Sequence, residues 1–227
     1  MNFIIGDSRV RGLKDTVSNL QFTEVWSRPG AKISDVFEMV EGVTVLHHGA
    51  ENSRSHIYII VGICNLTDRL KDHRKKYDEV IFNKIKYYES KEKIKNELIE
   101  LAKYAIKQYS AVIFCTIYPM NLSTWNHHRL KSRRTSYLQF ESQYSEMQSD
   151  LEKAVCDFNQ FIIKMNAETG LATPMLNRDF LRNRSKGRKE PRYCDLHDGC
   201  HPNVALNEKF KVTLNAACKR NEKKMRA

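Results

Sequence analysis

The chain has 227 residues, with 38 Lys and Arg against 27 Asp and Glu, which gives a formal net charge of +11. This length suits one large domain, and a hydrophobic fraction of 41% excludes wholesale disorder. The sequence contains no long apolar run and no basic segment followed by an apolar stretch and a cleavage site. We therefore expect a soluble, intracellular protein, cytoplasmic or nuclear, without a signal peptide. The positive charge would attract nucleic acid or an anionic membrane surface as a partner.

Short apolar segments alternate with helical patterns along the chain. The first half predicts a strand at residues 3–5, a helix at 9–20, a strand at 22–27, a helix at 28–40 and a strand from 56 that ends at Gly62. The run HIYIIVGICNL, which contains this last strand, is the most apolar in the chain and is rich in β-branched side chains, as strands buried on both faces are.

The second half continues the alternation with longer helices. It predicts a charged helical region at 77–108, a strand at 110–119, a long helix at 136–168 and a closing helix at 204–219. Two basic stretches, NHHRLKSRRT (126–135) and RNRSKGRKEPR (182–192), are predicted to be exposed loops. We expect one domain over residues 1–219, followed by a basic C-terminal tail at 220–227 that frays.

The order of the elements predicts an α/β fold. Strands that alternate with helices imply right-handed crossovers and a parallel sheet covered on both faces. In such sheets, ligands gather at the carboxyl ends of the strands. Ser8, in the Gly6-Asp7-Ser8 turn, and the turn at Gly62 both lie at predicted strand ends, so we expect both at one rim. Taken alone, a serine at this place is most often the N-cap of a helix.

A base and a carboxylate near the C-terminus would give Ser8 a chemical role. A serine hydroxyl is a poor nucleophile until a base removes its proton. The segment DGCHPN places Asp198 and His201 three residues apart, in a loop before the closing helix. The carboxylate is then close enough to orient the imidazole. Asp195 lacks this spacing and is the less favoured partner.

These segments resemble motifs of the SGNH (GDSL-type) hydrolase superfamily, whose members are serine esterases and lipases. IIGDSRVRG resembles the first block of the family, RPGAKISDV the second and DGCHPN the last, in the family's order. The resemblance implies a three-layer, flavodoxin-like, doubly wound α/β sheet of about five parallel strands. It also implies Ser8 as the nucleophile, His201 as the base and Asp198 as its partner. The backbone N–H groups of Ser8 and Gly30 would bind the oxyanion, and no metal or organic cofactor is implied.

The third block departs from the family pattern Gly-x-Asn-Asp, in which the asparagine side chain donates to the oxyanion. Here VGICNLTDR aligns without a gap so that Cys64 occupies the asparagine position. A one-residue bulge would instead bring Asn65 to the site. The loss of one such donor costs roughly a hundred- to a thousandfold in turnover. We therefore expect weak activity if Cys64 stands there.

Two function hypotheses follow. The first is a serine-dependent ester hydrolase that acts through an acyl-enzyme on Ser8, with a small-molecule ester, a lipid ester or an O-acetyl group as substrate. The alternative is a catalytically weak or inactive SGNH-like module, for example from a transposable element, that binds nucleic acid. Its basic surface would include Arg129, Lys131, Arg133 and Arg134. The oligomeric state is not predicted.

Histidines and cysteines do not predict a metal site. Neighbouring histidines on an extended chain point to opposite sides, so the pairs at 47–48 and 127–128 are interpreted as surface residues. A zinc site is disfavoured because its four ligands would crowd into eight residues without a second cluster. These would be Cys194, His197, Cys200 and His201. The six scattered cysteines are expected to be reduced.

Overall fold

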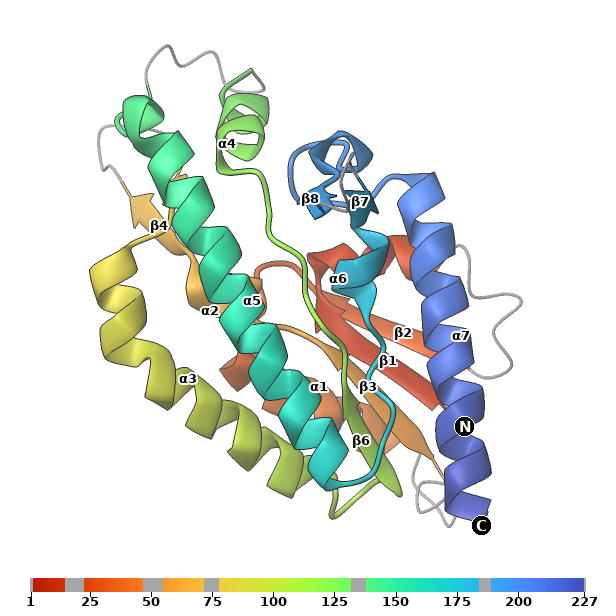
Figure 1. Ribbon diagram of the computed structural model, residues 1–227. Coiled ribbons are helices and arrows are strands. Elements are labelled where there is room, and N and C mark those ends of the chain that lie inside the picture. The colour runs from red at the N-terminus through yellow and green to blue at the C-terminus, as the bar shows by residue number, and fades with distance from the viewer. Residues whose placement is uncertain are drawn as a thin grey trace.

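The computed structural model describes residues 2–14, 23–46, 55–71, 78–131, 138–183 and 189–226. Its centre is a parallel sheet with the strand order β2-β1-β3-β6 (Figure 1). The strands are β1 (Asn2–Asp7), β2 (Thr23–Arg28), β3 (His56–Ile60) and β6 (Ala111–Phe114). The predicted α/β class with a parallel sheet is confirmed. Within the described ranges the sheet has four strands, where about five were expected.

Helices cover both faces of the sheet, which gives the three layers that the sequence predicts (Figure 1). One face packs against α1 (Ile33–Leu46), α3 (Lys84–Ala105) and α5 (Tyr144–Glu168), and the other against α6 (Leu176–Asp179) and α7 (Val204–Arg226). Successive side chains of a strand point to opposite faces. In β1, Phe3 and Ile5 therefore join the core on the α1 side, whereas Ile4 joins the core on the α7 side.

Side chains of α5, rather than a fifth strand, cover the outer edge of β6. The Asn166 carboxamide accepts the Phe114 N–H at 3.2 Å and donates to the Phe114 carbonyl at 2.7 Å. Two helical turns earlier, Asn159 makes the same pair of bonds with Ile117, both at 2.7 Å. The segment after α5 contains Pro174, which cannot donate to a ladder. These carboxamides occupy the edge at Phe114 and at Ile117 just after the strand, and the described residues form no fifth strand beside β6.

Three segments near the site differ from the prediction. In place of a helix at 9–20 the structure has a 3₁₀ helix, η1, over Ser8–Leu13, and residues 15–22 lie outside the described ranges. The central strand ends at Ile60, two residues before the predicted end at Gly62, and a short helix, α2 (Ile63–Leu66), follows Gly62. The region 77–108 begins with a strand, β5 (Asp78–Ile81), which pairs antiparallel with β4 (Asp68–Lys71). Strands of four residues are too short to show a clear period in the sequence.

The two basic stretches are also more ordered than predicted. The first falls mainly in a helix, α4 (Leu122–Lys131), which begins where the Asn121 side chain accepts the Thr124 N–H at 2.8 Å. The second holds a hairpin of β7 (Leu181–Asn183) and β8 (Lys189–Pro191), with 184–188 outside the described ranges.

The start of one long helix and a short turn before the DGCHPN loop also differ from the prediction. The helix expected from residue 136 begins at Tyr144, after the 3₁₀ turn η4 (Glu141–Gln143). A further turn, η6 (Tyr193–Asp195), leads to the DGCHPN loop.

The C-terminal residues expected to fray are helical. α7 continues to Arg226, and Asn221 within it is fully buried. Its Oδ1 accepts the Ala172 N–H at 2.6 Å, and its Nδ2 donates to the Ala172 carbonyl at 3.2 Å. These bonds hold the last turns of α7 against the rest of the protein.

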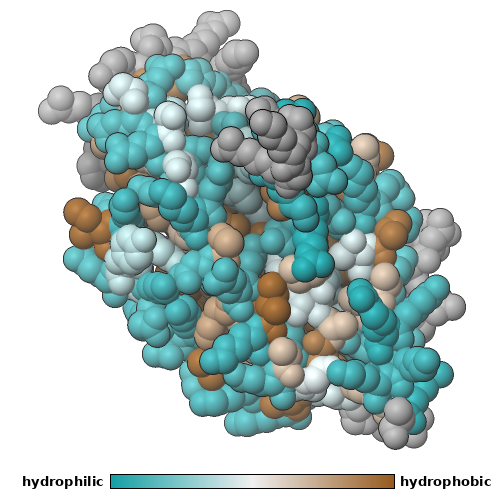
Figure 2. Space-filling model, in the orientation of Figure 1, coloured by the Kyte–Doolittle hydropathy of each residue, from teal (hydrophilic) through white to brown (hydrophobic). Residues whose placement is uncertain are grey.

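The surface in view is mostly polar. Hydrophilic side chains cover most of this face, with hydrophobic ones in separate small patches (Figure 2). Among the described residues, no helix combines the length and the hydrophobicity that a membrane crossing requires.

Candidate active site

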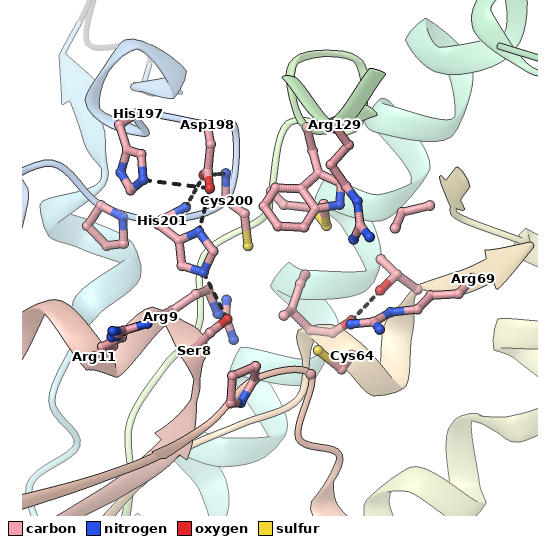
Figure 3. Close-up of a pocket in the computed structure, with 18 of the residues that line it drawn as sticks. Ser8, Arg9, Arg11, Cys64, Arg69, Arg129, His197, Asp198, Cys200 and His201 are labelled. Carbon is pink, nitrogen blue, oxygen red and sulfur yellow. Dashed lines mark hydrogen bonds and ion pairs between the residues drawn. The ribbon is translucent and has the colours of Figure 1, made fainter. Parts of the chain in front are cut away.

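Ser8 stands at the carboxyl end of β1, where η1 begins, and its hydroxyl meets the ring of His201 (Figure 3). Ser8 Oγ lies 2.8 Å from His201 Nε2, although the two residues are 193 positions apart in the chain. Asp7 caps η1, because its Oδ1 accepts the Arg9 N–H at 3.0 Å. The Ser8 hydroxyl is therefore not used as a helix cap and faces the histidine.

Asp198 holds the other side of the His201 ring. Its Oδ2 lies 2.6 Å from His201 Nδ1, and its Oδ1 accepts the N–H groups of Cys200 at 2.9 Å and His201 at 2.8 Å. Burial alone would raise the pKa of Asp198, but the bond to the His201 ring and these two N–H groups hold that pKa well below its usual range. Asp198 is thus an ionised acceptor for Nδ1, which leaves Nε2 free to act as a base toward Ser8.

Backbone contacts fix the loop that carries this pair. The His197 N–H donates to the His201 carbonyl at 3.0 Å, and the Asn121 N–H donates to the Gly199 carbonyl at 2.7 Å. Gly199 has a φ of 87°, and a Cβ at this position would stand 2.6 Å from the backbone N of Trp125. The loop is therefore packed tightly against the first turn of α4, where the Trp125 ring lies 5.6 Å from the His201 ring.

His197 lies beside the pair. Its ring stacks on the His201 ring at 5.7 Å, and its Nε2 is 3.6 Å from Asp198 Oδ2. The ligand atoms of His197, Asp198 and His201 lie within 4.8 Å of one another, close enough to hold a metal ion. Cys194 and Cys200, considered above as zinc ligands, are not in this group. The hydrogen bond between the Ser8 hydroxyl and Nε2 favours the interpretation of this group as a base and its carboxylate.

A buried ion pair below Ser8 was missed by the sequence analysis. Arg9 Nη2 lies 2.7 Å from Asp7 Oδ2, with both side chains only 1% exposed. Arg9 Nη1 donates to the Tyr118 carbonyl at 3.1 Å, and the guanidinium lies 5.0 Å from the centroid of the Tyr118 ring. Because unpaired buried charges are costly, this closed network fixes the strand end that carries Ser8. An acid and a base two residues apart were the only sequence signal.

The expected oxyanion residues are only partly brought together. Ser8, Gly30 and Cys64 line one cavity, whereas Asn65 is not among its lining residues. Asn65 Oδ1 instead accepts the Ile33 N–H at 3.0 Å, at the start of α1. The structure thus places Cys64 where the alignment without a gap has it, and no bulge brings Asn65 to the cavity in this described segment. Burial raises the pKa of the Cys64 thiol to about 11, so the group is a neutral S–H at pH 7.

The cavity above Ser8 has a volume of about 1030 Å³ and a mixed wall. Apolar lining comes mainly from Ile63, Val80, Met120 and Trp125. Basic side chains from several segments stand around it. They are Arg11, Lys32, Arg69, Lys86 and Arg129.

Only one of the four basic residues of the nucleic-acid hypothesis can be placed by its side chain. Arg129 lines the cavity, and its guanidinium lies 5.5 Å from the centroid of the Trp125 ring. Lys131 ends α4, and Arg133 and Arg134 lie outside the described residues. The described residues therefore do not show the four basic side chains together on one surface, and the nucleic-acid hypothesis gains no support from them.

Comparisons with known proteins are informative about the fold. No protein-family model and no curated protein matches the chain. Among solved structures, a member of the lipolytic G-D-S-L family from Veillonella parvula is similar, with 10% identity, a TM-score of 0.56 and coverage of 93% of this chain and 94% of that chain. Phospholipase A1 from Streptomyces albidoflavus has 13% identity, a TM-score of 0.55 and coverage of 95% and 98%. The acetyl xylan esterase AlAXEase has 15% identity, a TM-score of 0.56 and coverage of 96% and 99%.

Identities this low carry information about architecture and not about substrate. The fold that these three solved structures share with this chain is the fold implied by the resemblance of its GDS, Pro-Gly and DxxH segments to the SGNH motifs. The chain therefore has the fold of the SGNH (GDSL-type) hydrolases.

Proposed function

We propose that this chain is a serine-dependent ester hydrolase that acts through an acyl-enzyme on Ser8. The observation that carries the proposal is the 2.8 Å contact between Ser8 Oγ and His201 Nε2, with Asp198 2.6 Å from the other ring nitrogen. A hydroxyl, a base and an orienting carboxylate within hydrogen-bond reach are what nucleophilic acyl transfer requires. The fold, which is shared with esterases and lipases, supports the same reaction class.

In the acylation step, Ser8 Oγ attacks the ester carbonyl carbon while His201 Nε2 takes the hydroxyl proton. The charge that develops on the carbonyl oxygen is met by the N–H groups of Ser8 and Gly30 and by the Cys64 thiol. An S–H group is a weak donor, so this oxyanion site stabilises the transition state less than one with an asparagine. The bond to the alcohol then breaks, and the alcohol leaves with the proton held by His201.

In the deacylation step, a water molecule attacks the acyl carbon and gives one proton to His201. The bond between Ser8 Oγ and the acyl group breaks, the acid is released, and the proton returns to Ser8. Asp198 stays ionised in both steps and stabilises the positive ring of His201.

The test is hydrolysis of p-nitrophenyl acetate and butyrate by the wild type, Ser8→Ala and His201→Ala. Each substitution is expected to lower kcat by about 10⁴-fold or more. Ser123→Ala, which removes an exposed hydroxyl on α4, is the matched control and should keep the wild-type rate. A phosphonate ester should add its mass to the peptide that contains Ser8. Equal rates in the wild type, Ser8→Ala and His201→Ala would contradict the proposal.

A further inference from the structure

We infer that the cavity over Ser8 selects esters whose acyl part carries an anionic group such as a carboxylate, and that Arg69 is the main residue that binds this group. The inference rests on the proposed function, and it names the substrate class of the same site. It is carried by the charge of the cavity wall, by the position of Arg69 and by an unsatisfied donor next to Arg129.

The cavity wall has an excess of positive charge. The buried Arg9 is neutralised by Asp7, and Lys86 forms an ion pair with Asp68. Three further cations line the cavity: Arg11, Lys32 and Arg69. Among the described residues, no carboxylate lies within ion-pair distance of any of the three. Charges gathered around a cavity with apolar walls raise the local concentration of an anionic ligand.

Arg69 lies directly beside Gly30, one of the residues of the expected oxyanion site. A Cβ on Gly30 would stand only 2.7 Å from Arg69 Nη2, so the guanidinium packs directly on the glycine whose N–H is proposed to bind the carbonyl oxygen. Gly30 has a φ of 73° and no side chain, which leaves the room that Arg69 occupies. A planar guanidinium with paired donors matches a carboxylate in a bidentate manner.

The position of Arg69 relative to His201 indicates which half of the ester it meets. His201 must protonate the leaving alcohol, so the alcohol lies on the His201 side of Ser8. Figure 3 shows Arg69 and Arg129 across the cavity from His197 and His201, with Cys64 on the Arg69 side. The two guanidinium groups therefore face the acyl half.

A polar group in the wall also lacks a partner. The indole Nε1 of Trp125 is buried and, within the described part of the chain, has no hydrogen-bond acceptor. Arg129 lies over the same ring at 5.5 Å. A buried donor without an acceptor costs stability, and an anionic oxygen entering beside Arg129 would supply one. The volume of about 1030 Å³ exceeds the needs of an acetyl group and leaves space for such an extended acyl chain.

The test compares two esters that differ only in charge, mono-p-nitrophenyl glutarate and its methyl ester. The measured quantity is the ratio of kcat/KM for the acid to kcat/KM for the methyl ester. We expect about a tenfold or larger ratio for the wild type, which is the range of one charge-assisted hydrogen-bonded pair. Arg69→Gln should bring the ratio to about one, and Arg69→Lys should give an intermediate value. Arg220→Ala, an exposed arginine on α7, is the control and should keep the wild-type ratio.

Different failures have different meanings. Hydrolysis that depends on Ser8 with a wild-type ratio near one would overturn this inference and leave the proposed function intact. Hydrolysis that does not depend on Ser8 would overturn the proposed function itself. An unchanged ratio in Arg69→Gln would refute the role of Arg69. A ratio near one, together with tight competition by a single-stranded oligonucleotide, would assign the cations to nucleic acid instead.

A salt titration of the wild type keeps the test valid if Arg69→Gln does not fold. Added salt screens charges at an accessible cavity wall. The ratio should therefore fall toward one as sodium chloride rises from 0.05 to about 1 M. A ratio that stays constant over this range would count against charge recognition.

Discussion

The two sides of Ser8 are built in different ways. On the base side, Asp198 and His201 belong to one loop, three residues apart, and meet at 2.6 Å. On the proposed oxyanion side, Gly30 and Cys64, with Arg69 beside them, come from three segments: the turn before α1, α2 and β4. A pair within one loop keeps its geometry as long as its spacing is kept. A site assembled from separate segments can differ at one member without a change in the fold. Here Cys64 stands at the position where the SGNH pattern has asparagine.

The largest expected effect tests the base side. Asp198→Asn should lower kcat by about 10⁴-fold, because an amide in place of the carboxylate favours the wrong tautomer of His201. The measurement is steady-state hydrolysis of p-nitrophenyl butyrate. His197→Gln is the control, since His197 also lies near Asp198, at 3.6 Å, but does not contact Ser8. It should lower kcat by less than about tenfold. Equal losses in the two variants would mean that the pair is not the functional unit.

The next effect tests the oxyanion side. Cys64→Asn should raise kcat by about a hundredfold, because a carboxamide N–H is a much stronger donor than a neutral thiol. Cys64→Ala should lower kcat by less than about tenfold, since it removes only a weak donor. Both are measured with p-nitrophenyl acetate under the same conditions.

Asn65→Ala separates the two alignments of the third block. Asn65 Oδ1 accepts the Ile33 N–H, so this variant should lose about 1 kcal/mol of unfolding free energy, as other lost helix caps do. Its kcat should stay within a few-fold of the wild type. If Asn65→Ala instead cost a hundredfold in kcat while Cys64→Asn gained nothing, Asn65 would be the donor and the assignment of Cys64 would be wrong.

Much of the base side follows from the sequence, and less of the oxyanion side does. The strand end at Ser8 and the DxxH spacing at Asp198 and His201 are local patterns, so the sequence indicated all three residues. The pairing of Arg9 with Asp7 depends on the Tyr118 carbonyl, which lies 109 positions away in the chain. No local sequence pattern predicts a contact between residues so far apart in the chain.

Arg69 was missed by the sequence analysis, and the number of strands differs from the one that the family resemblance implies. Arg69 lies on β4, whose four residues show no clear period, and its role depends on how the hairpin of β4 and β5 packs beside Gly30. The fifth strand was expected because the resemblance to the SGNH hydrolases implies about five, whereas the alternation in the sequence itself predicts four. Asn166 bonds the edge of β6 at Phe114 and Asn159 bonds Ile117 just after it, and these contacts depend on two side chains rather than on hydrophobic pattern.

A pair of glycines, one on each side of Ser8, gives a smaller effect. Both have positive φ, at 73° for Gly30 and 87° for Gly199, so alanine is strained at either position. A Cβ on Gly30 meets the flexible end of Arg69, whereas a Cβ on Gly199 meets the backbone N of Trp125 at 2.6 Å. Gly199→Ala should therefore lower the unfolding free energy by about 3 kcal/mol, against about 1 kcal/mol for Gly30→Ala. Urea denaturation measures both, and equal losses would show that the base loop is no more rigid than the turn.

The smallest effect is a pH dependence that belongs to the base side alone. The pKa of Asp198 is held well below its usual range, since its hydrogen bonds to His201 and Cys200 outweigh burial. Its contribution to stability is therefore complete above the unfolded-state pKa of about 3.9 and is lost as the pH falls through the lower folded-state pKa. The stability advantage of the wild type over Asp198→Asn should be constant from about pH 6 to pH 5 and should shrink toward pH 3. Urea denaturation at each pH measures it. An advantage that stayed constant down to pH 3 would mean that Asp198 is not held in its ionised form by the loop, and the contrast between the two sides of Ser8 would lose its electrostatic basis.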